Sequence, residues 1–230
     1  MIIPIIVSLY LLCSLLPLSP DSISFHADTM RAELAEGKER TVLSGSATLI
    51  SDDLVIQSDL IELFGEDFIF AECTGSVRVN NEKKGFNIAA DKLFYNRRDK
   101  ITRIQGNAVM EDTKNEIVIK GGVIENRDKE ELVTVQIGVR ILKKDLIGRS
   151  QMARYYRDEQ KLELSGMPVV WWKEDEYRAT KIYVNLETDE VSMEGDVQAQ
   201  VKYKSEEDSA EKGPAGQGPA GQGPGEVKSE

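Results

Sequence analysis

The chain has 230 residues, of which 40% are hydrophobic and 30% charged, and its formal net charge is −11. This length allows one substantial domain or two small ones. No Lys/Arg-rich run provides the basic surface that follows nucleic-acid phosphates, so the composition argues against a nucleic-acid partner. The same charge balance disfavours binding to an anionic membrane surface.

The chain begins with an uncharged, mostly apolar run over residues 1–19, interrupted by Pro4 and Pro17. A run of this length predicts a signal peptide over residues 1–22, or alternatively a retained N-terminal anchor. Lipidation of Cys13 is a weaker alternative, because Tyr10 stands where a lipobox requires Leu. Cleavage after Cys13 would leave Cys73 as the only cysteine, so no intramolecular disulfide could form.

A repeat of about 30 residues follows, in which a glycine is embedded in a strand with period-two alternation. The glycines are Gly45, Gly75, Gly106, Gly138, Gly166 and Gly195, at intervals of 30, 31, 32, 28 and 29 residues. The residues two before, two after and four after each glycine are mostly apolar, which predicts half-buried strands. The fourth unit breaks this pattern at Gln136 and Arg140.

A second strand in each unit aligns without gaps over residues 25–32, 56–63, 88–95, 119–126, 148–155 and 177–184. Its third column is always small: Ala27, Ser58, Ala90, Gly121, Ser150 and Ala179. The apolar alternation changes phase beside this column, which predicts a bulge or a sharp bend. Only three units carry Asp in the next column, at Asp28, Asp59 and Asp91, so a structural role is favoured over catalysis.

The repeats predict an all-β fold over residues 23–204, with about a dozen antiparallel strands and hairpin loops between them. If each repeat gave one strand to each of two sheets, six rungs would extend about 29 Å. Residues 205–230 contain GPAGQ twice in tandem and almost no large apolar residue. We expect a disordered tail there.

Candidate chemistry is sparse along the chain. The nucleotide-binding and α/β-hydrolase motifs are absent, and His and Cys are too few for a zinc site. His26 is expected at the surface, and Cys73 is expected to fill an apolar slot. Trp171 and Trp172 must point to opposite faces of one strand. The sequence therefore predicts no enzyme, no cofactor and no metal site.

The strand pattern in "IAADKLFY" and "RIQGNAVM" (residues 88–110), repeated in "IQSDLIEL" with "CTGSVRV" and in "FHADTM" with "LSGSATL", resembles the OstA-like/LptA family of periplasmic lipopolysaccharide-transport proteins. The resemblance covers residues 23–203. It implies a V-shaped, twisted β-jelly roll whose apolar interior holds lipid acyl chains. It also implies a non-enzymatic, periplasmic carrier that bridges the inner and outer membranes.

The resemblance further implies partners and a site. The partners would be lipopolysaccharide or a related glycolipid, the jelly-roll domains of inner-membrane and outer-membrane components, and other copies of the chain joined head to tail. The groove candidates are Phe25, Leu43, Ile56, Val77, Ile88, Leu93, Tyr95, Ile104, Met110 and Ile182. The apolar columns alone are equally compatible with a dry core.

Two alternatives stay open. An inner-membrane-anchored, LptC-like partner of the same bridge would retain the N-terminal segment. A β-solenoid scaffold or glycan-binding surface protein would have a solid core in place of a groove.

Overall fold

The computed structural model describes residues 23–33, 35 and 37–202, and the predicted signal peptide and tail lie outside them. Sixteen strands are assigned in this part of the chain, with two short 3-10 helices, η1 (Glu66–Phe68) and η2 (Asp128–Glu130). The strands are β1 (Ile23–His26), β2 (Thr29–Glu33), β3 (Arg40–Ser51), β4 (Leu54–Phe64), β5 (Phe70–Asn81), β6 (Phe86–Asn96), β7 (Ile101–Asp112), β8 (Ile117–Arg127), β9 (Leu132–Lys143), β10 (Leu146–Tyr156), β11 (Lys161–Ser165), β12 (Val169–Trp172), β13 (Asp175–Arg178), β14 (Lys181–Asn185), β15 (Glu190–Glu194) and β16 (Gln198–Gln200).

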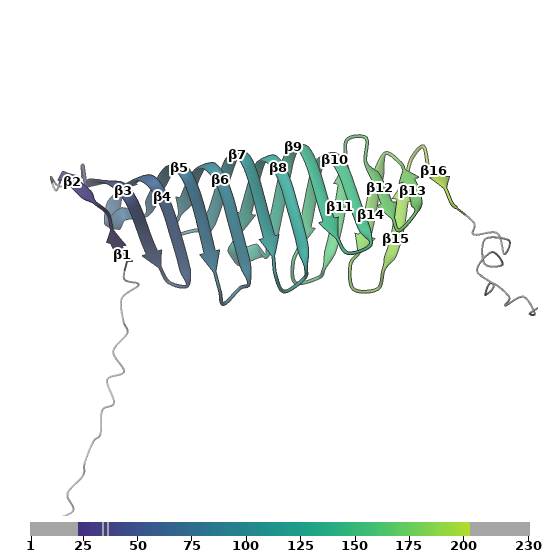
Figure 1. Cartoon of the computed structure of the whole chain (residues 1–230), viewed down its shortest axis with the longest axis horizontal. Coiled ribbons are helices and arrows are strands. Elements are labelled where there is room, and N and C mark those ends of the chain that lie inside the picture. The colour runs from purple at the N-terminus through teal and green to yellow at the C-terminus, as the bar shows by residue number, and fades with distance from the viewer. Residues whose placement is uncertain (1–22, 34, 36, 203–230) are drawn as a thin grey trace, which may run out of the picture.

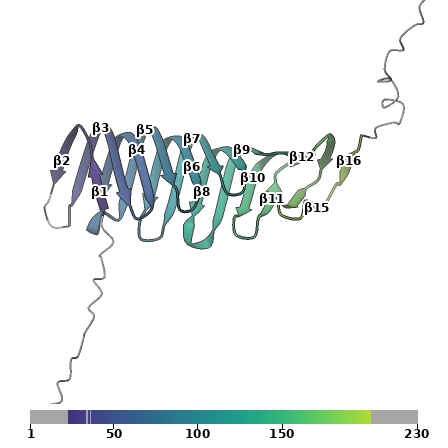
Figure 2. The same ribbon diagram turned by 60° about the horizontal axis from the view of Figure 1, so that its bottom comes forward.

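All sixteen strands belong to one antiparallel sheet, in the order β1-β3-β4-β5-β6-β7-β8-β9-β10-β11-β14-β15, with β2 also beside β3 and with β12, β13 and β16 continuing from β10. Four strand runs are each divided in two at the middle: β1 with β2, β11 with β12, β13 with β14, and β15 with β16. The described residues thus form twelve runs, which follow one another along the long axis (Figures 1 and 2). The prediction of about a dozen antiparallel strands is confirmed.

Each run crosses a bend and contributes to two layers of the folded-over sheet. Leaf A contains β1, β12, β13, β16 and the halves of β3–β10 that meet at the hairpins of residues 52–53, 82–85, 113–116 and 144–145. Leaf B contains β2, β11, β14, β15 and the other halves. The layers are joined along one long margin by the bends, and the sheet is not closed by strand pairing along the other.

This arrangement overturns the expected length. Because every run passes through both leaves, each leaf holds twelve strand segments and not six. Twelve segments at about 4.8 Å each extend about 58 Å, twice the roughly 29 Å expected from one strand per repeat and sheet. No helix among the described residues is long and apolar enough to cross a membrane.

A two-residue bulge shapes the bend in each repeat. The pairing of β3 with β4 skips from Ser44 to Ala47, so Gly45 and Ser46 face a single residue of the neighbouring strand. Gly45 has φ +76° and Ser46 has φ +45°, and the same left-handed pair recurs at Gly75–Ser76 and Gly106–Asn107. Since left-handed backbone strains most side chains, glycine at the first position removes part of that cost.

The aspartates of the repeat lie against these glycines. A Cβ built on Gly106 would be 2.4 Å from Asp91 Oδ2, and Asp28 with Gly45 and Asp59 with Gly75 repeat the arrangement. Asn107 Nδ2 also donates a hydrogen bond to Asp91 Oδ2 at 3.0 Å. The structural interpretation of the aspartate column therefore agrees with the contacts that the structure shows.

The fourth repeat reverses this pairing and corrects the predicted register. The bulge begins at Ile137 (φ +69°), one residue before Gly138, and it faces Gly122 of the preceding strand. A Cβ on Gly122 would be 2.9 Å from Ile137 Cβ. Gly122 therefore stands opposite the first bulge position, whereas in the other repeats a glycine occupies that position. In both arrangements, one of the two facing residues has no side chain. The inward residues are consequently Val135, Val139 and Ile141, whereas Gln136, Arg140 and Leu142 point outward.

Candidate lipid-binding interior

The predicted groove residues lie between the two leaves, on the inner face of the sheet. Nine of the ten are buried: Leu43, Ile56, Val77, Ile88, Leu93, Tyr95, Ile104, Met110 and Ile182. They belong to one apolar cluster that extends from β3 to β14 and continues to the partly buried Val191 and Met193. The structure therefore brings together residues from widely separated repeats, and in this state they pack against one another.

Phe25 differs from the other nine because it lies at the end of the molecule. It faces Leu49 across the β1–β3 pair and is 38% exposed. Met30, which faces Leu43 on leaf B, is 60% exposed. At the opposite end, Val197 is 52% exposed. Apolar side chains at both ends of the described sheet are thus accessible.

Small and polar residues shape the inner side of the bend. Ser58 Oγ donates to the Leu60 carbonyl at 2.5 Å, and Ser150 Oγ donates to the Met152 carbonyl at 2.9 Å. A Cβ on Gly121 would be 2.6 Å from Val135 Cγ1. These contacts explain why the small column tolerates no large side chain and why its hydroxyls can be buried.

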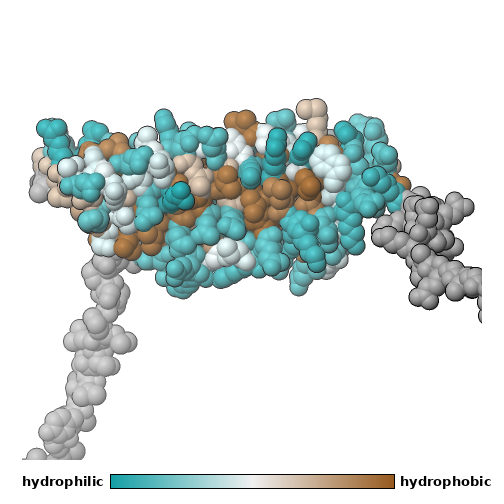
Figure 3. All heavy atoms as spheres, in the orientation of Figure 1, coloured by the Kyte–Doolittle hydropathy of each residue, from teal (hydrophilic) through white to brown (hydrophobic). Residues whose placement is uncertain are grey.

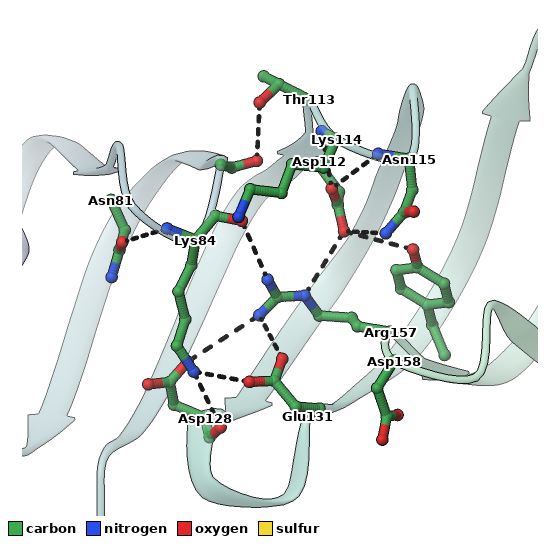
Figure 4. Close-up of polar contacts among 12 residues, drawn as sticks. Asn81, Lys84, Asp112, Thr113, Lys114, Asn115, Asp128, Glu131, Arg157 and Asp158 are labelled. Carbon is green, nitrogen blue, oxygen red and sulfur yellow. Dashed lines mark hydrogen bonds and ion pairs between the residues drawn. The ribbon is translucent and has the colours of Figure 1, made fainter.

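The free long margin is closed by side chains instead of backbone pairing, in a group that we call the clasp: Lys84 and Asp112 from leaf A, with Asp128, Glu131 and Arg157 from leaf B (Figure 4). Lys84 Nζ lies 2.8 Å from Asp128 Oδ1 and 2.7 Å from Glu131 Oε1. Arg157 Nε lies 3.5 Å from Asp112 Oδ2. These contacts join hairpins that are up to 73 residues apart in sequence.

Asp112 and Arg157 are buried at the centre of the clasp, with side chains 1% and 7% exposed. Asp112 accepts hydrogen bonds from the backbone N–H groups of Lys114 and Asn115 and from the Tyr155 hydroxyl. Arg157 is less well satisfied, because its Nε and Nη1 atoms make no hydrogen bond among the described residues. It is held mainly by attraction to carboxylates and by its stacking at 5.2 Å over the Phe86 ring.

Charge and burial raise the pKa values of two groups, Lys84 of the clasp and the neighbouring Tyr155. Burial alone would lower the pKa of the Lys84 ammonium, but hydrogen bonds to Asp128 and Glu131 outweigh it and raise the pKa. Burial, followed by the Asp112 charge, raises the pKa of Tyr155 well above its usual range. Lys84 is therefore cationic and Tyr155 neutral at physiological pH, as their contacts require.

A second bridge crosses the same margin beside a small cavity. Lys100 of leaf B forms an ion pair with Asp52 of leaf A. A cavity of about 60 Å³ lies between this pair and Lys84, and the core residues Leu54, Phe86 and Tyr95 also line it. The other side chains that line this cavity are polar.

The structure also shows the surroundings of the other residues that the sequence analysis singled out. Cys73 is fully buried in the apolar cluster, where burial and then the Glu72 charge raise the pKa of its thiol to about 12, so it is unreactive near neutral pH. Trp172 packs against the core, whereas Trp171 points outward and its Nε1 donates to Glu176 at 3.0 Å. His26 is exposed on β1.

Sequence reasoning missed the clasp entirely. Its members lie in or beside hairpins whose sequences are typical of polar turns. No regular sequence spacing connects Lys84 with Glu131 or Asp112 with Arg157. The only available signal was Arg157, a charged residue two positions beyond the inward-facing Tyr155, where the inward alternation continues into the loop.

Comparison with family models matches the chain over residues 22–163 to the OstA-like protein family. The chain belongs to this family. Comparison with solved structures matches this OstA-like chain to LptH, described as the LptA homologous periplasmic component of the conserved lipopolysaccharide transport device from Pseudomonas aeruginosa. That match has 9% sequence identity and a TM-score of 0.25, and it covers 80% of this chain and 96% of that one. No curated protein matches the chain, and the family assignment rests on the sequence match.

Proposed function

We propose that this OstA-like protein is a non-enzymatic periplasmic carrier that holds the acyl chains of lipopolysaccharide or a similar glycolipid between its two leaves. One observation carries the proposal: an apolar interior runs the length of a sheet whose second long margin is held only by side chains. A solid scaffold gains nothing from leaving that margin without backbone pairing. Burial of acyl chains there would gain about 25 cal/mol per Å² of apolar surface.

The clasp is the proposed entry site for the acyl chains. Parting the leaves at this margin breaks ion pairs and side-chain hydrogen bonds but no strand pairing. The under-bonded Arg157 makes this separation less costly than breaking a fully satisfied network would be. The anionic headgroup would stay outside, among the lysines of the hairpins, while the chains enter toward Phe86 and Tyr95.

The ends support assembly into a bridge. On leaf A, β1 and β16 each have one unpaired side, and on leaf B the same holds for β2 and β15, within the described strands. Head-to-tail stacking would therefore match leaf A to leaf A and leaf B to leaf B by strand addition. It would also join the exposed apolar residues at the two ends into one continuous interior. Related domains of membrane-anchored components are the other partners that such ends fit.

Photocrosslinking tests the carrier directly. A diazirine analogue placed at Leu93, which points inward, is expected to form lipid adducts in cell envelopes, and one at the exposed neighbour Lys92 is not. Ile88 with Ala89 forms a second matched pair. Adducts at neither inward position would reject the carrier. Analytical ultracentrifugation tests the assembly separately. We expect the average molecular mass to rise with protein concentration.

One observation favours a second candidate, a scaffold with a solid core. The inner-face residues are packed to near-zero exposure without any lipid. Absence of both lipid adducts and co-purifying lipid, with the fold intact, would establish this alternative.

A further inference from the structure

The outer face of leaf A carries an unusual row of cations across β8, β9 and β10. Lys120 pairs directly with Arg140, and Arg140 pairs directly with Arg149. Among the described residues, none of the three lies within ion-pair distance of a carboxylate. Like charges directly opposite one another destabilise a sheet, so this row costs stability unless something anionic covers it. We call these three residues the cationic strip.

Leaf B shows how the same protein pairs its charges elsewhere. Arg103 pairs across the strands with Glu125, with Nη1 and Oε2 3.7 Å apart, and Arg154 pairs with Glu163 at 3.6 Å. Glu62 and Glu72 also stand directly opposite each other on leaf B, but Glu62 has Arg40 as an ion-pair partner at 2.7 Å. The row on leaf A differs because none of its three like charges has such a partner among the described residues.

An apolar row runs beside the cationic strip, two residues nearer the hairpins on β8, β9 and β10, and continues onto β12. The face of the molecule seen in Figure 3 carries apolar residues as well as polar ones, and the apolar residues form an interrupted band along the long axis. On leaf A, this second row consists of Val118, Leu142, Ile147 and Trp171, each paired with the next across the strands. Leu142 is 39% exposed and Ile147 is 45% exposed. We call these four residues the apolar strip.

Arg149 joins the two strips. Its guanidinium carbon lies 5.1 Å from the centre of the Trp171 ring. Trp171 in turn donates to Glu176, whose pKa is lowered by hydrogen bonds from Arg178 and from this indole. The acidic side chain nearest to Trp171 is thus already engaged by Arg178, and it leaves the cationic strip uncompensated.

We propose that the two strips form a docking surface for an anionic lipid bilayer. Guanidinium and ammonium groups bind lipid phosphates, Trp favours the membrane interface, and short apolar side chains enter the headgroup boundary. An acidic protein segment would compensate the cationic strip only, whereas a bilayer surface covers both strips. This docking is independent of whether the interior carries lipid.

The overall acidity does not prevent this contact. At physiological ionic strength, charges separated by more than about 8 Å are largely screened, so the local strip decides the interaction at close range. Each cation near an anionic membrane surface contributes about fivefold to the partition coefficient. Three cations acting together therefore predict an effect of about a hundredfold.

Vesicle binding by the full chain tests the proposal. The protein with Trp172→Phe keeps Trp171 as its only indole, and brominated lipids in vesicles of phosphatidylcholine with phosphatidylglycerol are expected to quench its fluorescence. The variant K120Q/R140Q/R149Q should lose this quenching and about a hundredfold in binding. The matched variant K92Q/R103Q/R154Q makes the same charge change on leaf B and should retain both.

Quenching of Trp171 fluorescence distinguishes binding through the two strips from binding through the apolar segment of residues 1–19, which all variants share. Thermal unfolding separates misfolding from lost binding, because removing three like charges should leave the fold at least as stable. Unquenched Trp171 in vesicle-bound protein, or equal losses in the leaf B variant, would overturn the proposal. So would carbodiimide coupling of Lys120 to the carboxylates of residues 206–211 without vesicle binding, since the strip would then be occupied by the chain's own acidic segment.

Discussion

The two long margins of the folded sheet are built in opposite ways. At the bend, the backbone runs continuously from one leaf to the other, and each repeat carries a bulge in which a glycine faces a side chain. At the free margin, hairpins of the two leaves meet through the clasp and the Lys100–Asp52 pair. The bend is thus fixed by local covalent geometry, whereas the free margin depends on charges that can separate. A lipid carrier of the proposed kind, which would open along one side and stay folded along the other, needs this difference.

The bend should be the more sensitive margin to a single substitution. Gly106→Val places a β-branched residue at φ +73° and puts its Cβ within contact of the Asp91 carboxylate. Left-handed strain and the clash together should lower the free energy of unfolding by about 3 kcal/mol or more. Urea denaturation measures this loss. A loss below about 1 kcal/mol would show that the bulge can rearrange without cost.

The clasp should give a smaller, coupled effect. Arg157→Met leaves Asp112 buried without its cation and should destabilise the protein by about 2 to 3 kcal/mol, since Asn115 and Tyr155 still bind the carboxylate. Asp112→Asn and the double variant complete a mutant cycle that isolates the pair. If the clasp controls entry, the same variants should also take up lipid faster. Stability loss with unchanged uptake would separate the clasp from entry.

Alkaline pH should distinguish the core from the free margin. The pKa of Cys73 is raised in the folded state, so the unfolded chain loses its thiol proton first, and stability should fall by roughly 1.4 kcal/mol per pH unit above pH 9. Tyr155 and Lys84 of the free margin, also raised, should add to this fall from about pH 10. In Cys73→Val, the decline should therefore begin about one pH unit later. Denaturation at a series of pH values checks the onset, and an unchanged onset would contradict the assignment.

The reversed bulge of the fourth repeat offers the mildest test. Gly122→Asp alone should clash with Ile137, whereas Gly122→Asp with Ile137→Gly restores the arrangement of the other repeats. The double variant should lie within about 1 kcal/mol of the native protein and be more stable than Gly122→Asp. Melting curves of the three proteins suffice. A double variant as unstable as the single one would mean that the two residues do not act as a pair.

The sequence predicted the repeating parts of the molecule well, because strands and bends produce patterns among residues that are close together in the sequence. Period-two alternation located the inner face, and the small column beside Asp28, Asp59 and Asp91 located the bend. The fourth repeat was placed one residue too late, since the glycine at 138 occupies the second bulge position and Ile137 occupies the first. A search for glycines cannot detect that the missing side chain has moved to Gly122 on the preceding strand.

The amino-acid sequence by itself determined the fold class, the approximate number of strand runs and nine inward-facing residues of the interior. Only the tertiary structure decided that each of the twelve runs passes through both leaves, that Lys84, Asp112 and Arg157 meet at the free margin, and that Lys120, Arg140 and Arg149 stand in one row. The physical reason is the range of the interactions. Alternation and backbone strain act between neighbours along the chain, whereas charges meet wherever the register of pairing brings them, and one residue of slip would have turned every one of these side chains to the other face.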